Sequence, residues 1–498
     1  MSIVNRTMYP LQSSMGLITR MQDRFAQLQV QLATGQKAGT LAEMGTDRFY
    51  DLSIRARMSR IEGYQQSAGT LNMRLAVFGE VMGRLDTVES NARTAITQSA
   101  YGSSNVNFGT APVVARSSLD EVIHLLNTDV DGRHLFAGGK VDQRPVESIA
   151  TILDGANGKA GFTQIARERL EADQGDGLGR LTLGVAGNAV ALDEDGGHVF
   201  GFKLSTITAS SSGIAVTSSV ATQPRAMGIT VNAQPAAGDS ITIGLTLPDG
   251  TAHGITLHAV AEVTGPDQFA IGADADATAA NIEAALRDTL KTDAKTELAS
   301  ASNYAAADNF FNAHGTKVQR VEGPFATATM LVDADPSTTV MWYRGEDADD
   351  ARGSVKAKLD DAATVSYGAQ ANESGPLALV RSLAVLAIQQ LGNNDATSGG
   401  RFDAIAQRNN ARLSESHNNE AGSIEMISVE LGIAHANADS ISSRQKGYVA
   451  QLEGLLGDLE DVPKEDVAME MLAIQTRLQA SYQATALVAQ LSLVNYLR

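Results

Sequence analysis

Residues 424–460, IEMISVELGIAHANADSISSRQKGYVAQLEGLLGDLE, decide the fold. Eleven seam positions recur in this stretch at alternating spacings of three and four residues: Ile424, Ile427, Leu431, Ala434, Ala438, Ile441, Gln445, Tyr448, Leu452, Leu455 and Leu459. Such a period keeps one apolar stripe along an α-helix, as in a coiled coil or a long-helix bundle. The stretch therefore predicts one long helix that packs by a single face, with Gln445 as the one strongly polar member of that face.

Two runs near the other end of the chain show the same alternation. They are Leu11, Ser14, Ile18, Met21, Phe25, Leu28 and Leu32, and, after the break ATGQKAGT (33–40), Ile61, Tyr64, Ala68, Leu71, Leu75, Phe78, Met82 and Leu85. A last helix is predicted to begin near Pro463, with acidic residues in its first turn. Net charges of +3 for residues 1–40 and −2 for residues 459–498 favour pairing of the two ends.

The middle of the chain has a different pattern. SITIGLTLPDGTAHGITLHAV (240–260) places two β-rich runs around a Pro-Asp-Gly turn, which indicates a hairpin. ATAANIEAALRDTLK (277–291) predicts a helix, and ATATMLVDADPSTTVMWYRG (326–345) predicts a return to strand. The fold class is thus mainly α with an α+β insertion: a discontinuous long-helix coiled-coil bundle formed by both chain ends, with a β-rich outer domain.

The expected domains follow from this layout. They are an N-terminal assembly helix (1–40), the N half of a helical bundle (41–150), a variable mixed α/β insertion (151–345), the C half of the bundle (346–460) and a C-terminal assembly helix (461–498).

Composition argues against several classes of function. The chain has no cysteine, which excludes disulfides and cysteine-ligated metals. Residues 151–350 hold 26 acidic and 12 basic residues, a net charge of −14, which disfavours nucleic-acid binding. His253 and His258 form no zinc motif, and the loops DGANGKAG (154–161), DQGDGLG (173–179) and LDEDGG (192–197) lack phosphate-loop or calcium-loop spacing. We therefore expect no enzyme activity, no cofactor and no metal.

The C-terminal end raises a separate question. Residues 478–497 carry no charge, yet Gln, Ser, Thr and Asn interrupt them, so a bilayer is a poor environment for this segment. Two interpretations remain: a buried helix of one globular domain, or a surface that packs against other subunits. The start of the chain, MSIVNRTMYPLQSS, lacks the pattern of a cleavable secretory signal.

Several segments resemble the bacterial flagellin superfamily. EDVAMEMLAIQTRLQASYQATALVAQLSLVNYL (465–497) is similar to the C-terminal helix of that superfamily. LQVQLATGQKAGTLAEMGTDRFYDLSIRARMSRIEGYQQ (28–66), DGRHLFAGGKVDQRPV (131–146) and MWYRGEDADDARGSVKAKLDDAATVSYGAQANESG (341–375) resemble its hook-associated protein 3 family of hook–filament junction proteins. The resemblance covers about residues 1–150 and 340–498, and the second flagellin motif, of D-D-A-A-G type, is missing.

The resemblance implies a structural protein of the flagellum, exported without a cleaved signal and located outside the cell at the hook–filament junction. The implied partners are further copies in a homo-oligomeric ring, the neighbouring hook-associated junction protein, flagellin, the filament cap during assembly and an export chaperone, with no nucleic acid and no membrane insertion. Flagellin itself, and a binding or adhesin module in the insertion, stay as alternatives. The expected assembly residues are Leu11, Ile18, Phe25, Leu28, Leu32, Leu478, Tyr482, Leu487, Val488, Leu491, Val494 and Leu497.

Overall fold

The computed structural model describes the backbone of residues 9–99, 109–392 and 395–496, and the side chains of residues 15–94, 109–392 and 395–488. It divides into two compact units. Unit 1 comprises Met1–Leu71, Lys358–Thr364 and Asn437–Arg498, and unit 2 comprises Asn72–Ala357 and Val365–Ala436. The chain is mainly helical: long helices from its two ends pack together, and a β-rich insertion separates them in the sequence.

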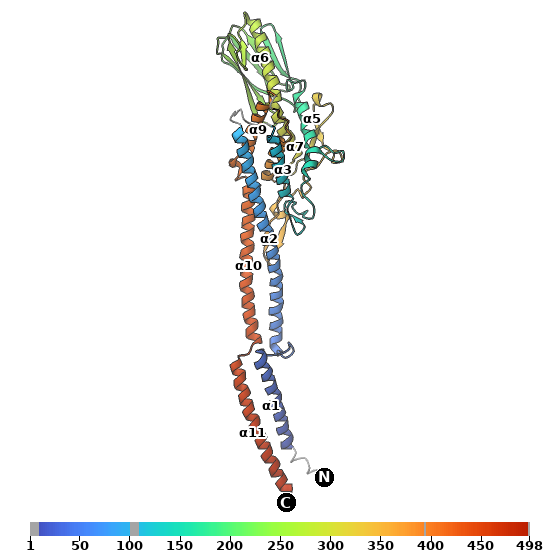
Figure 1. The fold of residues 1–498 in the computed structure, drawn as a ribbon, viewed down its shortest axis with the longest axis vertical. Coiled ribbons are helices and arrows are strands. Elements are labelled where there is room, and N and C mark those ends of the chain that lie inside the picture. The colour runs from blue at the N-terminus through green and yellow to red at the C-terminus, as the bar shows by residue number, and fades with distance from the viewer. Residues whose placement is uncertain (1–8, 100–108, 393–394, 497–498) are drawn as a thin grey trace. The chain divides into compact units, whose positions relative to one another are not determined.

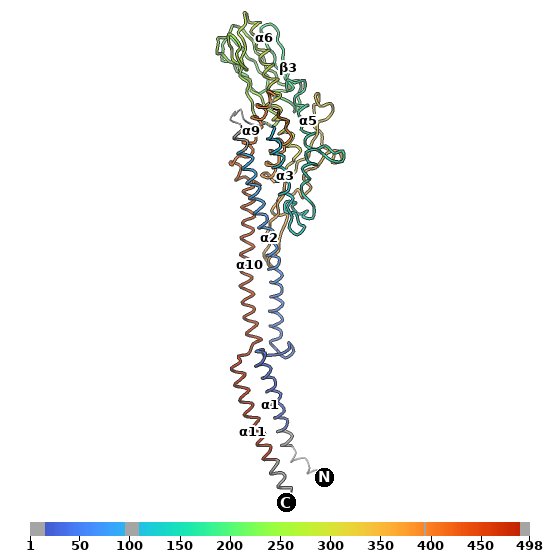
Figure 2. The backbone as a smooth tube through the Cα atoms, in the orientation of Figure 1, coloured from blue at the N-terminus to red at the C-terminus, as the bar shows by residue number. Residues whose placement is uncertain are grey.

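Four long helices come from the two ends of the chain: α1 (Tyr9–Thr34), α2 (Arg48–Ser99), α10 (Ile424–Glu460) and α11 (Lys464–Tyr496). In unit 1, α1 lies beside α11, as Figures 1 and 2 show. Helix α2 packs with α10, and the apolar period predicted for both helices faces inward. Buried members of that period in unit 1 are Ile61, Ala68, Leu71, Ala438, Gln445 and Leu452, and those in unit 2 are Leu75, Phe78, Met82, Leu85, Ile424, Ile427, Leu431 and Ala434.

The seam departs from its predicted period at one position. Leu455 is 53% exposed, and Leu456 is the less exposed neighbour. The spacing from Leu452 to the next inward residue is therefore four residues rather than three, and the helix ends soon afterwards at Glu460. Helix α11 begins at Lys464, directly after Pro463, whose carbonyl accepts from the amides of Asp466 and Val467.

Unit 2 holds the remaining helices. They are α3 (Ala111–Leu126), α4 (Ile149–Asp154), α5 (Phe162–Gln174), α6 (Ala275–Lys295), α7 (Glu297–Phe310), α8 (Ser374–Ala387) and α9 (Ser398–Arg412). Phe78 of α2 meets Phe136, from the DGRHLFAGG segment, with ring centroids 5.3 Å apart. Trp342 is fully buried beside Phe311 and Tyr343.

The insertion contains two four-stranded sheets, and α6 packs against strands of both (Figure 1). One sheet has the order β3-β4-β7-β6: β3 (Leu181–Ala186), β4 (Ala189–Glu194), β7 (Ala226–Val231) and β6 (Ile214–Ser219). The other has the order β10-β9-β8-β5: β10 (Gln268–Ala270), β9 (Ala252–Val260), β8 (Ser240–Thr246) and β5 (Lys203–Ala209). Their common core includes four fully buried side chains: Ile243, Leu245, Leu257 and Leu286.

The predicted hairpin is confirmed, because β8 and β9 pair antiparallel on either side of Pro248, Asp249 and Gly250. The predicted helix at 277–291 lies within α6. The predicted strand at 326–345 is mostly wrong, since only Leu331–Asp333 forms a strand (β12), pairing with β11 (Gln319–Val321). The remaining strands are β1 (Asp129–Val130), β2 (Arg133–His134), β13 (Lys356–Lys358) and β14 (Thr364–Ser366).

Candidate assembly surface

Helices α1 and α11 form an antiparallel pair inside unit 1. At one end of the pair the amide of Val462 donates to the carbonyl of Gly35 (2.9 Å), and that of Lys37 donates to Glu460 (2.6 Å). Farther along, the Arg24 guanidinium binds both carboxylate oxygens of Glu470, at 3.0 and 3.1 Å. Because Arg24 and Glu470 come from opposite ends of the chain, this ion pair agrees with the opposite net charges of those ends.

The seam between the two helices is narrow. Leu28, Val467, Ile474 and Leu478 are buried in it. Ile18, Met21, Phe25, Leu32, Val462 and Met471 are partly buried around them. Five of the expected assembly residues, Ile18, Phe25, Leu28, Leu32 and Leu478, therefore lie against the partner helix of the same chain.

Three other expected assembly residues face solvent. Tyr482 is 48% exposed, Leu487 is 60% exposed and Val488 is 48% exposed. The Tyr482 hydroxyl accepts a hydrogen bond from the side-chain amide of Gln22 at 2.6 Å. Leu11, Leu491, Val494 and Leu497 lie outside the residues whose side chains are described, so the expectation for them stays a prediction.

Sequence reasoning missed Met469 and Leu472, which lie on the face of α11 opposite the seam. Met469 is 64% exposed and Leu472 is 60% exposed. Leu487 follows Met469 by five helical turns of about 3.6 residues, so the two share one face. We call Met469, Leu472 and Leu487 the outer face of α11. Their spacings of three and fifteen residues form no regular period, so no apolar pattern in the sequence indicates this face.

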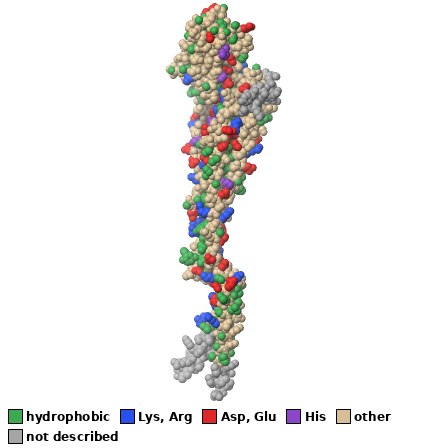
Figure 3. Space-filling model, turned by 90° about the vertical axis from the view of Figure 1, so that its left-hand side faces the viewer, with side chains coloured by type: hydrophobic (Ala, Val, Ile, Leu, Met, Phe, Trp, Pro, Cys, Tyr) green, Lys and Arg blue, Asp and Glu red, His purple; other side chains and the backbone are tan. Residues whose placement is uncertain are grey.

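More apolar surface lies elsewhere in unit 1. Phe49 and Tyr50, in the first turn of α2, are 75% and 60% exposed, and their rings meet edge to face with centroids 6.0 Å apart. Leu52 and Leu41 are also exposed. Figure 3 shows hydrophobic side chains at the surface among the charged ones. Contiguous exposed apolar side chains are typical of interaction surfaces.

A charged cluster connects the start of α2 with the end of α10. Arg55 binds Asp51 at 3.0 Å and also contacts Glu460. The Glu460 carboxylate raises the pKa of Arg55, and a hydrogen bond with Asp51 raises the pKa of Glu460. Because the Glu460 carbonyl also accepts from Lys37, the same cluster helps to position the segment between α1 and α2.

A groove of about 940 Å³ lies between α2 and α10 in unit 1. The turn between β13 and β14 reaches it, where the carbonyl of Leu359 accepts from the side chain of Gln445. Asp361 accepts from the hydroxyl of Tyr64 at 2.8 Å and from Arg60 at 3.3 Å. The polar member of the predicted seam thus binds a backbone carbonyl, so its conspicuous place in an apolar stripe is structural.

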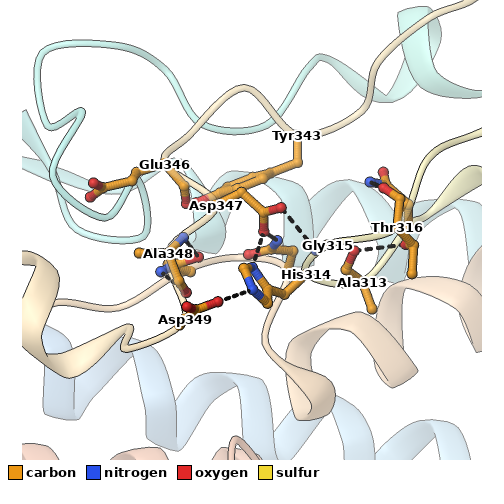
Figure 4. A network of polar contacts seen from close by, with 12 residues as sticks. Ala313, His314, Gly315, Thr316, Tyr343, Glu346, Asp347, Ala348 and Asp349 are labelled. Carbon is orange, nitrogen blue, oxygen red and sulfur yellow. Dashed lines mark hydrogen bonds and ion pairs between the residues drawn. The ribbon is translucent and has the colours of Figure 1, made fainter.

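Unit 2 contains a histidine held by two carboxylates (Figure 4). Nδ1 of His314 lies 2.9 Å from Asp347, and Nε2 lies 2.6 Å from Asp349, and both carboxylates raise the pKa of His314. Burial raises the pKa of Asp347, but hydrogen bonds from the Gly315 amide, His314 and Asn372 outweigh it and lower that pKa. The Thr316 hydroxyl donates to the carbonyl of Ala313 at 2.7 Å, away from the imidazole. The network joins the loop around His314 to the loop that carries Asp347 and Asp349. Among the residues labelled in Figure 4, no hydroxyl donates to the imidazole of His314.

The acidic loops of the insertion also bind internal partners. Asp173 accepts from Arg169 and Ser302, both at 2.7 Å, and from the Gly201 amide at 2.9 Å. Asp195 lies 2.6 Å from Arg180.

Within the described residues, no group of three or more acidic or histidine side chains is arranged to hold a metal ion. No helix in the described part of the chain is long and apolar enough to cross a membrane.

No protein-family model matches the chain, and no curated protein matches it.

Proposed function

We propose that the chain is a structural subunit of the bacterial flagellum, exported to the cell exterior, where it joins the hook to the filament in a homo-oligomeric ring. One observation carries the assembly role: α1 and α11 pair through a narrow seam, while the outer face of α11 stays exposed. The resemblance of the C-terminal segment to the flagellin superfamily, and of residues 28–66, 131–146 and 341–375 to the hook-associated protein 3 family, supports the place in the flagellum. Neighbouring junction protein, flagellin, filament cap and export chaperone are the partners this role requires.

The energetics support a second copy, or a related subunit, as the cover of the outer face. Covering one exposed Leu or Met stabilises by roughly 1.5–3 kcal/mol. Met469, Leu472 and Leu487 lie on one face of α11, so one helix laid along that face contacts all three. Leu487 lies in the uncharged segment 478–497, so no ion of that segment has to lose its water when it packs.

The test places a carboxylate on that face. Leu487→Asp should abolish assembly, because desolvating an unpaired charge costs several kcal/mol, more than Leu burial contributes. The isolated chain should keep its melting temperature, since Leu487 is already exposed in it. Electron microscopy of a deletion strain that expresses the variant should show intact hooks with shed filaments. The exported variant should be found in the culture medium.

Two matched variants separate assembly from folding. Leu487→Gln introduces a polar side chain of similar size that carries no charge. It should weaken attachment less than Leu487→Asp does. Ile474→Asp, in the seam, should open the α1–α11 pair even in the isolated chain, visible as faster amide hydrogen exchange in both helices. If cells with Leu487→Asp kept as many filaments attached to their hooks as cells with the parent chain, the proposal would be contradicted. Long filaments formed by the purified chain alone would favour flagellin.

A further inference from the structure

The two sheets of the insertion have four edge strands, and on three of these side chains bind the backbone of one residue. On β3, Arg287 of α6 donates to the carbonyl of Leu183 at 3.0 Å. On β5, Glu194 accepts from the Leu204 amide (2.9 Å) and Arg225 donates to its carbonyl (2.7 Å). On the three-residue strand β10, Asn281 donates to the carbonyl of Ala270 at 2.9 Å. Each of these contacts occupies backbone groups that an added strand would need.

The fourth edge, β6, is open. It pairs with β7 from Ile214 to Ser219, and no other hydrogen bond of the described insertion reaches residues 215–219. On β7 the Val231 amide donates towards β4, so the alternation of an antiparallel ladder turns Thr230 and Gly228 towards β6. Their partners are Ala215 and Thr217. The backbone groups of Val216 and Ser218 therefore point away from the sheet.

The surroundings of β6 carry no charge. Residues 204–224 contain no Asp, Glu, Lys or Arg, although residues 151–350 have a net charge of −14. Arg225, at the end of this stretch, is turned inward to Leu204. Ala215, Thr217, Ser218 and Ser219 are exposed. Edge strands of soluble proteins usually carry charges or proline to prevent pairing, and β6 has neither.

We infer that β6 pairs with β6 of a second copy of this chain, antiparallel, and joins two four-stranded sheets into one of eight strands. The occupant has to approach an acidic domain, and β6 lies in the longest uncharged stretch of that domain (204–224), so an uncharged strand fits best, and β6 is itself such a strand. With the two-fold axis at Thr217, the outward backbone amide and carbonyl of Val216 bind the carbonyl and amide of Ser218 in the other copy.

This inference goes beyond the proposed function and does not depend on it. Neighbours in a ring are related by rotation about the ring axis, whereas two paired β6 strands are related by a two-fold axis. The contact therefore joins copies that belong to different assemblies, or free copies before assembly. It uses no residue of α1 or α11.

The absence of cysteine from the chain makes the test direct. In the predicted register Thr217 faces Thr217 of the other copy in a non-hydrogen-bonded pair, with a Cα separation of about 4.5 Å. A disulfide spans such a distance. Thr217→Cys in the full chain should therefore give a disulfide-linked dimer on mild oxidation. Val185→Cys, exposed on the edge strand β3, is the matched control and should stay monomeric. The Leu487→Asp background keeps terminal assembly from bringing copies together.

Two further variants remove the pairing without cysteine chemistry. Ser218→Pro deletes an amide that points away from β7, so it should abolish the dimer in sedimentation velocity and leave the sheet intact. Thr217→Lys places two like charges opposite each other and should also abolish it, even if the proline variant misfolds. Equal crosslinking of Thr217→Cys and Val185→Cys, or a parent chain that sediments as a monomer at high concentration, would overturn the inference.

Discussion

The α1–α11 pair and the insertion use apolar residues in opposite ways. Among the described residues, the insertion and α6 enclose twenty-five buried side chains in one core, whereas the α1–α11 seam buries four. The helix pair leaves Met469, Leu472 and Leu487 exposed. The insertion is thus stabilised by its own core, whereas the helix pair buries few apolar side chains and leaves these three at its surface.

The ion pairs of the two regions differ in the same sense. Arg408 of α9 binds Asp249 at 2.8 Å and Glu297 at 2.9 Å, and the side chains of Arg408 and Asp249 are 6% and 0% exposed. Arg24 and Glu470 of the helix pair are 44% and 47% exposed. Water screens the second pair and not the first, so the same substitution should have very different effects in the two places.

The largest effect is expected for Arg408→Met. It leaves Asp249 buried without its cation, which typically costs 3–5 kcal/mol. Guanidinium unfolding followed by the fluorescence of Trp342, the single tryptophan and a buried one, should report a loss of that size in unit 2. Arg24→Met should change the stability of the helix pair by about 0–1 kcal/mol, measured by hydrogen exchange in α1 and α11. Similar losses in both would remove the contrast between the regions.

A second comparison uses one chemical change at two depths. Leu286→Ala, in the core beneath the sheets, should cost about 2–5 kcal/mol, since it leaves a cavity among packed side chains. Leu472→Ala, 60% exposed on α11, should change the stability of the isolated chain by less than about 0.5 kcal/mol. Thermal unfolding of the two variants measures both. A large loss for Leu472→Ala would mean that the outer face of α11 is already covered in the isolated chain.

The long-helix seams could be predicted because they depend on a local period. Ile61 to Leu85 and Ile424 to Leu452 repeat every 3.5 residues on average, and a helix needs no distant information to place such residues on one face. The β8–β9 hairpin followed from its turn residues for the same reason. The outer face of α11 lacks such a period, since its three residues are three and fifteen positions apart.

The contacts that close the fold were not predictable from sequence. Arg408 meets Asp249 across 159 positions of sequence, and Gln445 meets the carbonyl of Leu359. The polar position of Gln445 in the seam is visible in the sequence, but its partner is not, because a side chain's choice of partner depends on how the elements pack. The same holds for His253, whose acidic partner Asp293 lies on another element. Of the assembly residues, sequence could name the apolar ones but could not separate the intrachain seam from the free surface.

The smallest expected effect is a pH dependence confined to the insertion. His253 of β9 lies 2.9 Å from Asp293 of α6, and this contact raises the pKa of His253 although burial opposes it. Glu297 raises the same pKa further, and Arg408 lowers it. A raised histidine pKa means that the contact stabilises the folded state fully below about pH 6.5, the ordinary value, and is lost as the pH rises through the folded value.

The stability of the parent chain should therefore fall, relative to that of His253→Gln, between about pH 6 and pH 8, by less than about 1 kcal/mol because solvent partly screens the contact. The difference between the two chains isolates His253 from the other histidines of unit 2. His258→Gln, at an exposed position of the same strand, should leave the dependence unchanged. Helices α1 and α11 contain no histidine, so hydrogen exchange in them should show no stability step over this range. A step in α1 and α11 that follows the step in the insertion would show that the two regions unfold together, and the contrast between them would be lost.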